Sequence, residues 1–106
     1  MEMLNKVELT GKVGNVRIVN VVDTRVAHLS IATDYIYTNK DGYQTIETTW
    51  HYVDIWEKPD GPSLDDIKKG AAINVKGRLR NRKYISFAGE EVIRTEIVAY
   101  AWKVVE

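Results

Sequence analysis

Residues 72–84 alternate between aliphatic and polar side chains with a period of two. Ile73, Val75, Gly77 and Leu79 share one parity. The other parity carries polar, basic and aromatic residues, namely Asn74, Lys76, Arg78, Arg80, Arg82 and Tyr84. Successive side chains of a β-strand point to opposite faces, whereas a helix repeats every 3.6 residues. The pattern therefore predicts a strand with an apolar inner face and a basic outer face that ends in an aromatic ring.

The same alternation over residues 45–56 places large aromatic residues on a single side. Val53 and Ile55 take the inner parity. The outer parity carries Thr48, Trp50, Tyr52, Asp54 and Trp56. Large apolar side chains that face solvent usually mark a binding surface. Burial of both faces, by a second layer or another subunit, is the alternative explanation for these rings.

Turn signals divide the chain into five extended segments and one short helix. The first segment begins near Lys6, bends at Gly11 and Gly14, and continues over residues 16–22. The others cover residues 25–37, 45–56, 72–84 and 92–104. Asp41-Gly42 predicts a hairpin turn, because glycine supplies the positive φ angle that such turns require.

A short helix is predicted over residues 64–69, between the third and fourth strands. Ser63 is a suitable N-cap, and Gly70 is placed to terminate the helix. Three strands, a helix and two strands form the element order of the OB-fold. We therefore predict an all-β, five-stranded OB-fold barrel that occupies residues 1–106 as one domain.

Composition is that of a globular domain, and it excludes several classes of protein. The chain has 106 residues, of which 44% are hydrophobic and 28% charged, which suffices for one core. It has no cysteine, and therefore no disulfide, thiol nucleophile or thiolate metal site. Neither a membrane span nor an apolar signal region is apparent, so we expect a cytoplasmic protein.

Charge is balanced overall and uneven along the chain. Fifteen Lys and Arg match fifteen Asp and Glu, so there is no global basic signature of a nucleic-acid binder. Seven basic residues and no acidic one lie between positions 68 and 83. A solvated strand face explains this run equally well. Beside aromatic rings, however, such cations suit unpaired DNA, because cations follow the phosphates and rings stack on any base. Asp54 would repel phosphate unless an arginine pairs with it.

Five short motifs, in the same order along the chain, resemble those of the bacterial single-stranded DNA-binding protein family. They cover residues 5–14, 26–33, 49–53, 68–84 and 95–98. The resemblance implies an OB-fold that holds unpaired DNA in replication, recombination or repair, without catalysis, cofactor or metal. It also implies a homotetramer, or a dimer as the smaller alternative.

The resemblance further implies which residues bind DNA. The four base-stacking positions fall on Tyr37, Trp50, Trp56 and Tyr84. Phosphate contacts fall on Lys40, Lys58, Lys69, Arg82 and Lys83, to which the basic stripe adds Arg78 and Arg80. His51 matches a histidine at the family's subunit interface, and Trp102 lies outside the stacking positions. Typical members continue into a tail with an acidic tip that recruits repair and replication proteins. This chain stops at Glu106, so tail-mediated partners are not expected of it.

Three alternatives stay open. Catalysis is poorly supported, because the only histidines are His28 and His51 and no His/Asp/Glu cluster has metal-ligand spacing. A primosomal replication protein of related fold would act mainly through protein contacts. An OB-fold module could also use its aromatic face only for self-association. Aromatic residues at all four stacking positions favour DNA binding over both.

Overall fold

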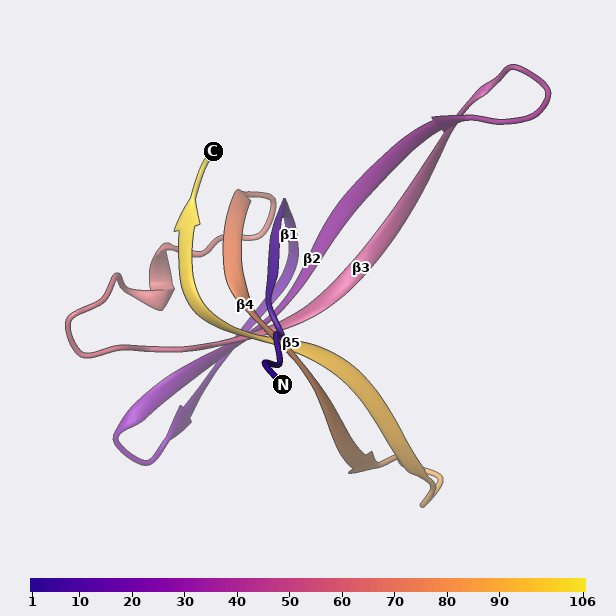
Figure 1. Ribbon diagram of the computed structural model, residues 1–106. Helices are drawn as coiled ribbons and strands as arrows, with labels where there is room; N and C mark the ends of the chain where they lie inside the picture. Colours follow the sequence, from indigo (N-terminus) through magenta and orange to yellow (C-terminus); the bar gives the residue numbers. More distant parts are fainter.

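Five strands close into a barrel in the computed structural model, which describes residues 1–106 (Figure 1). The strands are β1 (Val7–Val21), β2 (Thr24–Thr38), β3 (Gln44–Trp56), β4 (Ala72–Ile85) and β5 (Glu91–Val104). Their order around the barrel is β1-β2-β3-β5-β4. Only the β3–β5 pair is parallel, and the β1–β4 pair closes the barrel. The predicted five-stranded OB-fold is confirmed.

Two glycine-marked features of the prediction are also confirmed. The register of β1 against β2 shifts between Val13 and Asn15, so a bulge lies at Gly14 within one continuous strand. The turn between β2 and β3 has Gly42 at a φ of +84°, and the Gly42 amide donates to the carbonyl of Asn39 at 3.0 Å. Glycine adopts that conformation without steric cost.

The predicted helix over residues 64–69 is wrong in length. Only a single 3-10 turn forms, η1 (Leu64–Asp66), in which the hydroxyl oxygen of Ser63 accepts from the Asp65 amide at 3.1 Å. Ile67 is already extended, and the Gly70 amide donates to the carbonyl of Val13 in β1 at 2.8 Å. Pairing with β1 therefore replaces the hydrogen bonds that would have continued the helix.

The core is formed by the inner parities of the strands, closed at one end by η1. Its buried members are Val13, Ala27, Leu29, Ile31, Val53, Ile55, Leu64, Ile67, Ile73, Val75, Ile97 and Ala99. Leu79 was predicted to join them, but it is 45% exposed. The pairing of β4 with β1 ends at Gly77, so Leu79 lies where β4 and β5 leave the barrel. Beyond Gly77, β1 no longer pairs with β4, and the inward-facing side chains of β4 are left uncovered.

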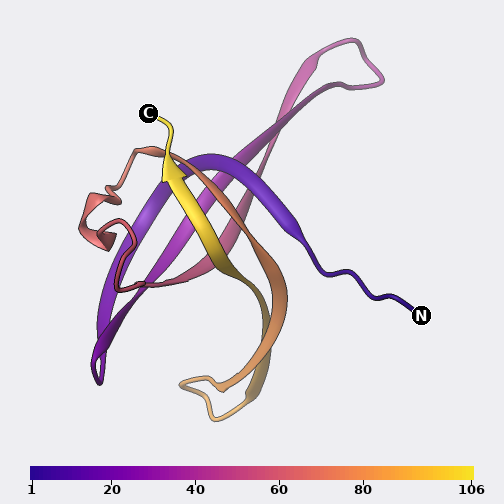
Figure 2. The same ribbon diagram turned by 60° about the vertical axis from the view of Figure 1, so that its left-hand side comes forward.

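The β2–β3 hairpin and the β4–β5 hairpin, which we call the arms, project from the barrel, and the β1–β2 hairpin projects as well (Figures 1 and 2). The outer parities of β3 and β4 form the outer surface, which carries Trp50, Trp56, Arg78, Arg80, Arg82 and Tyr84, whereas the other predicted site residues lie in loops or on the opposite parity. No helix of the structure has the length and apolar character that a bilayer crossing requires.

Candidate nucleic-acid interface

The centre of the outer surface is a cluster of charged side chains around two buried carboxylates. Asp54 on β3 is 5% exposed and Glu96 on β5 only 1%. Arg80 lies opposite Glu96 in the β4–β5 register, and its Nη2 is 3.1 Å from Asp54 Oδ2 and 3.5 Å from Glu96 Oε1. Asp54 stands in a row of aromatic residues and would repel phosphate unless an arginine paired with it. That arginine is Arg80.

Two further arginines and a histidine complete this cluster, which we call the arginine network. Arg82 Nε lies 3.0 Å from Glu96 Oε1, and Arg94 Nη2 lies 3.0 Å from Glu96 Oε2. His28 Nδ1 is 2.6 Å from Asp54 Oδ1. Three guanidinium groups thus face two carboxylates, which leaves the network with net positive charge even when His28 is neutral.

Glu96 is held in its ionised form. Burial of this carboxyl by itself raises its pKa, but the hydrogen bond from Arg94 and the charges of Arg82, Arg94 and Arg80 outweigh that effect. The pKa of Glu96 therefore lies below its ordinary value of 4.5. An ionised Glu96 fixes the three guanidinium groups at neutral pH.

Arg94 connects this network to two exposed rings. Its guanidinium carbon is 4.3 Å from the centroid of Tyr52 and 5.4 Å from that of Tyr84. Sequence reasoning missed Arg94. Only the strand pairing reveals its role, because there Arg94 lies opposite Arg82 and, on the same parity, two positions from Glu96.

Trp50 lies on this outer surface, as its parity predicts. It is 55% exposed, and its ring packs over the bulge at Gly14. A Cβ at Gly14 would stand 2.4 Å from a ring carbon of Trp50, so only glycine leaves room for the indole here. The bulge in β1 therefore helps to position this ring.

Tyr37 does not share the strand face of Trp50. Trp50 lies opposite Ala32, whereas Tyr37 lies opposite Thr45, on the other parity of the β2–β3 arm. The Tyr37 ring stacks on Tyr35, with centroids 5.9 Å apart. The four predicted stacking residues are all partly exposed, between 38% and 55%. Three of them belong to the outer parity, and Tyr37 extends along the arm.

The predicted cations fall into two groups. Lys40, Lys69 and Arg78 are exposed and form no salt bridge. The others already have partners: Arg80 and Arg82 in the arginine network, Lys83 with Glu91 at 3.3 Å, and Lys58 with the carbonyl of Tyr100 at 2.6 Å. The basic run in the sequence is therefore not a uniform patch of free cations.

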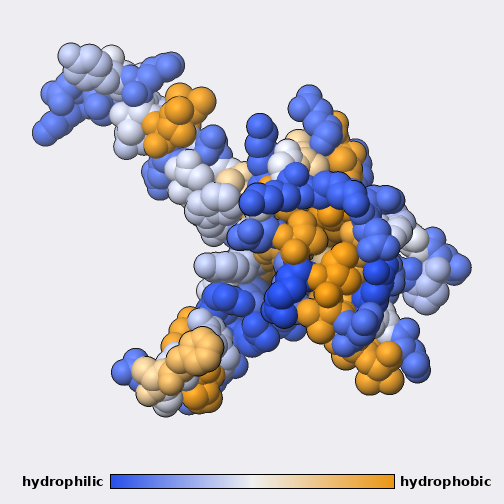
Figure 3. Space-filling view, turned by 180° about the vertical axis from the view of Figure 1, so that it is seen from behind, coloured by the Kyte–Doolittle hydropathy of each residue, from blue (hydrophilic) through white to orange (hydrophobic).

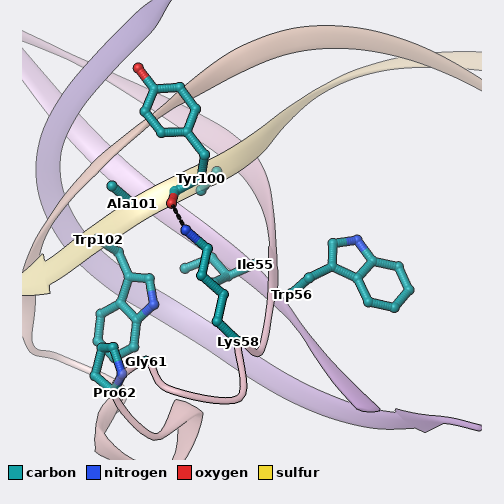
Figure 4. Close-up of a pocket in the computed structure, with 9 residues that line it drawn as sticks. Ile55, Trp56, Lys58, Gly61, Pro62, Tyr100, Ala101 and Trp102 are labelled. Atoms are coloured by element: carbon teal, nitrogen blue, oxygen red, sulfur yellow. Dashed lines mark hydrogen bonds between the residues drawn. The ribbon is translucent and has the colours of Figure 1, made fainter. Parts of the chain in front are cut away.

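Trp56 lines a hollow at the end of β3 (Figure 4). Trp102, which the sequence placed outside the stacking positions, lines the same hollow. The loop that forms one wall is held by Arg25, whose guanidinium pairs with Glu57 at 2.6 Å and with Asp65 at 3.1 Å. These hydrogen bonds lower the pKa of both carboxyls and raise the pKa of Arg25.

His51 has a structural contact within the chain. Its Nε2 lies 2.8 Å from the hydroxyl oxygen of Thr33 on β2, and the residue is half-buried. Its expected place at a subunit interface stays a prediction. No three His, Cys, Asp or Glu side chains are grouped in a way that would hold a metal ion.

The barrel is closed, has five strands in this order, and carries rings and guanidinium groups on an outer strand face. These features define an OB-fold domain, a class whose members bind oligonucleotides or oligosaccharides across their strands. The model of the single-strand binding protein family matches residues 4–105. The chain belongs to this family.

Curated relatives agree with this assignment. A single-stranded DNA-binding protein of Neisseria meningitidis is 30% identical over 102 residues, which cover 94% of this chain and 59% of the relative. One from Xanthomonas axonopodis pv. citri is 33% identical over 98 residues, which cover 91% of this chain and 54% of the relative. The chain thus spans little more than half the length of these relatives.

Solved structures show the same fold. The Plasmodium falciparum SSB in complex with ssDNA superposes with a TM-score of 0.79 and 25% identity, and the match covers 100% of this chain and 98% of that one. A deletion mutant of the single-stranded DNA binding protein from Thermus aquaticus superposes with a TM-score of 0.80 at 21% identity. That match covers 97% of this chain and 51% of the mutant.

Proposed function

We propose that this protein binds single-stranded DNA with little base preference and protects it during replication, recombination or repair. The observation that carries the proposal is the alignment of exposed rings with fixed guanidinium groups, above all Tyr52 and Tyr84 on either side of Arg94. Rings stack on bases of any sequence, and cations neutralise the phosphates between them. The curated relatives are named single-stranded DNA-binding proteins, and the Plasmodium falciparum neighbour is an SSB in complex with ssDNA.

The stacking surface comprises Trp50, Trp56 and Tyr84, with Tyr37 on the arm and Tyr52 from the outer parity of β3. Phosphates are bound first by the exposed Lys40, Lys69 and Arg78. Lys58, Arg80, Arg82 and Lys83 contribute while they keep their present partners, because each offers more than one N–H donor. This role needs no catalytic group. The proposal includes a cytoplasmic, nucleoid-associated location, which is in keeping with binding to DNA.

A homotetramer, with a dimer as the smaller alternative, completes the proposal. One barrel offers a short track for a long strand. Seen from behind, the apolar side chains of the body gather in one area bordered by polar residues (Figure 3). Exposed apolar residues such as Ile36 and Ile46 also lie on the β2–β3 arm. Sedimentation at micromolar concentration tests this point, and a species of only 12.1 kDa would exclude self-association.

The DNA proposal is tested by titrating one labelled oligonucleotide as a single strand and as a duplex. We expect tighter binding to the single strand, since stacking on the outer face requires bases that are unpaired and accessible. Affinity should fall with salt, with a log–log slope of about −0.7 for each phosphate contact. Equal or tighter binding to the duplex would contradict the proposal.

A further inference from the structure

The hollow beside Trp56 has the size and chemistry of a site for one flat ring. Its volume is about 290 Å³, and most of its lining is apolar. The lining residues are Ile55, Trp56, Lys58, Gly61, Pro62, Ala99, Tyr100, Ala101 and Trp102. Sites for small ligands occupy roughly 300–1,000 Å³, so this hollow accommodates a single ring system and little more.

The walls of the hollow are held in place before any ligand arrives. Trp102 and Pro62 lie beside each other on one side of Lys58, and Trp56 lies on the other (Figure 4). Trp102 packs against the core, and the Arg25 salt bridges fix the loop that carries Pro62. A preformed site loses less freedom on binding than one that must be ordered.

Lys58 supplies one positive charge at this hollow. Its Nζ donates to the carbonyl of Tyr100 at 2.6 Å. An ammonium group has three N–H donors, so two remain for another acceptor, and the side chain is exposed. Apolar walls with a single cation match a nucleotide, which combines a flat ring with an anionic phosphate.

We propose that this hollow holds one base of the bound strand, with the indole of Trp102 in contact with the base and Lys58 at the neighbouring phosphate. The inference rests on the proposed function. Trp56 belongs both to the stacking surface and to the wall of the hollow, so a strand that stacks on Trp56 passes the opening. Trp102 then becomes a DNA-contacting residue.

The test uses Trp50→Phe/Trp56→Phe, which keeps a ring at both stacking positions and leaves Trp102 as the only tryptophan. Dye-labelled oligothymidylate is added, and label anisotropy and Trp102 emission are recorded in the same titration. We expect Trp102 emission to fall in step with the rise in anisotropy. An unchanged emission at saturating anisotropy would overturn the inference and leave the proposed function intact. A wild-type protein that fails to raise the anisotropy would overturn both.

Two substitutions test the hollow by affinity. Trp102→Ala removes the ring, and Ala101→Leu fills the hollow while keeping the ring. Each should weaken oligothymidylate binding by about fivefold or more, the lower end of the effect of one stacked base, and Trp102→Phe should restore most of the loss. Thermal unfolding identifies any variant that loses its fold. Wild-type affinity in both folded variants would overturn the inference. Dilution of Trp50→Phe/Trp56→Phe without DNA provides a further test. A change in Trp102 emission on dilution would also overturn the inference, because it would show that a second copy of the chain covers the hollow.

Discussion

Removing the charge of Glu96 should lower the free energy of unfolding more than any other single substitution on the outer face. Glu96→Gln keeps the shape of the side chain, but it leaves Arg82 and Arg94 without their carboxylate partner, and Arg80 with Asp54 alone. Breaking a buried ion pair costs about 3–5 kcal/mol. The three arginine side chains are 34–44% exposed, so water offsets part of that loss. We therefore expect a loss of about 2–3 kcal/mol.

Urea denaturation and differential scanning calorimetry measure this loss directly. For a domain of about 100 residues, 1 kcal/mol corresponds to a Tm shift of roughly 4–8 °C, so the midpoint should fall by roughly 10–20 °C. The matched control is Glu91→Gln, which removes an exposed carboxylate 3.3 Å from Lys83 and should cost less than about 1 kcal/mol. If both variants unfolded at the same denaturant concentration, the arginine network would not have the role described above.

The same residue predicts an acid-sensitive stability. Its pKa in the folded state lies below the ordinary value of 4.5, so its contribution is complete above pH 4.5 and is lost as pH falls further through the folded-state pKa. The wild-type protein should therefore lose more stability than Glu96→Gln over that acidic range. Parallel loss in both proteins would contradict the ionised state of Glu96.

Four other substitutions separate stacking, charge and positioning. Trp56→Ala should weaken binding of single-stranded DNA by about 1–3 kcal/mol in a fluorescence-independent titration, and its sedimentation should match wild type; loss of assembly would instead make Trp56 an interface residue. Arg78→Ala should reduce the salt slope by about 0.7 at unchanged stability, whereas Arg82→Ala should lower slope and stability together because Arg82 also pairs with Glu96. Gly14→Ala should displace the Trp50 indole, because its Cβ would lie 2.4 Å from the ring, and should shift the emission spectrum; an unchanged spectrum would show that the ring is not held there.

The sequence was sufficient for features that depend on local patterns. Alternation predicted the strands because each face of a strand repeats every two residues, and Asp41-Gly42 predicted its turn because few residues adopt a positive φ. The outward placement of Trp50 followed from the same parity. The fold confirmed all of these, and it confirmed Ser63 as the cap of η1.

Other features depend on which strands meet, and the sequence does not state this. Arg94 gains its role only because β5 lies between β3 and β4, which brings Tyr52 and Tyr84 to its two sides. Leu79 is exposed because β1 ends its pairing two residues earlier. Trp56 and Trp102 line the same hollow because β3 and β5 are parallel neighbours, although the residues are far apart in the chain.

The most direct test of stacking on the outer face is the intrinsic fluorescence of the wild-type protein with saturating oligothymidylate. Trp50 and Trp56 are exposed on that face, so stacked bases should quench most of the emission. Saturation is established independently by the anisotropy of a label on the DNA. Strong quenching that saturates together with the anisotropy is the predicted result. Bound DNA that leaves the emission unquenched would contradict stacking on these rings.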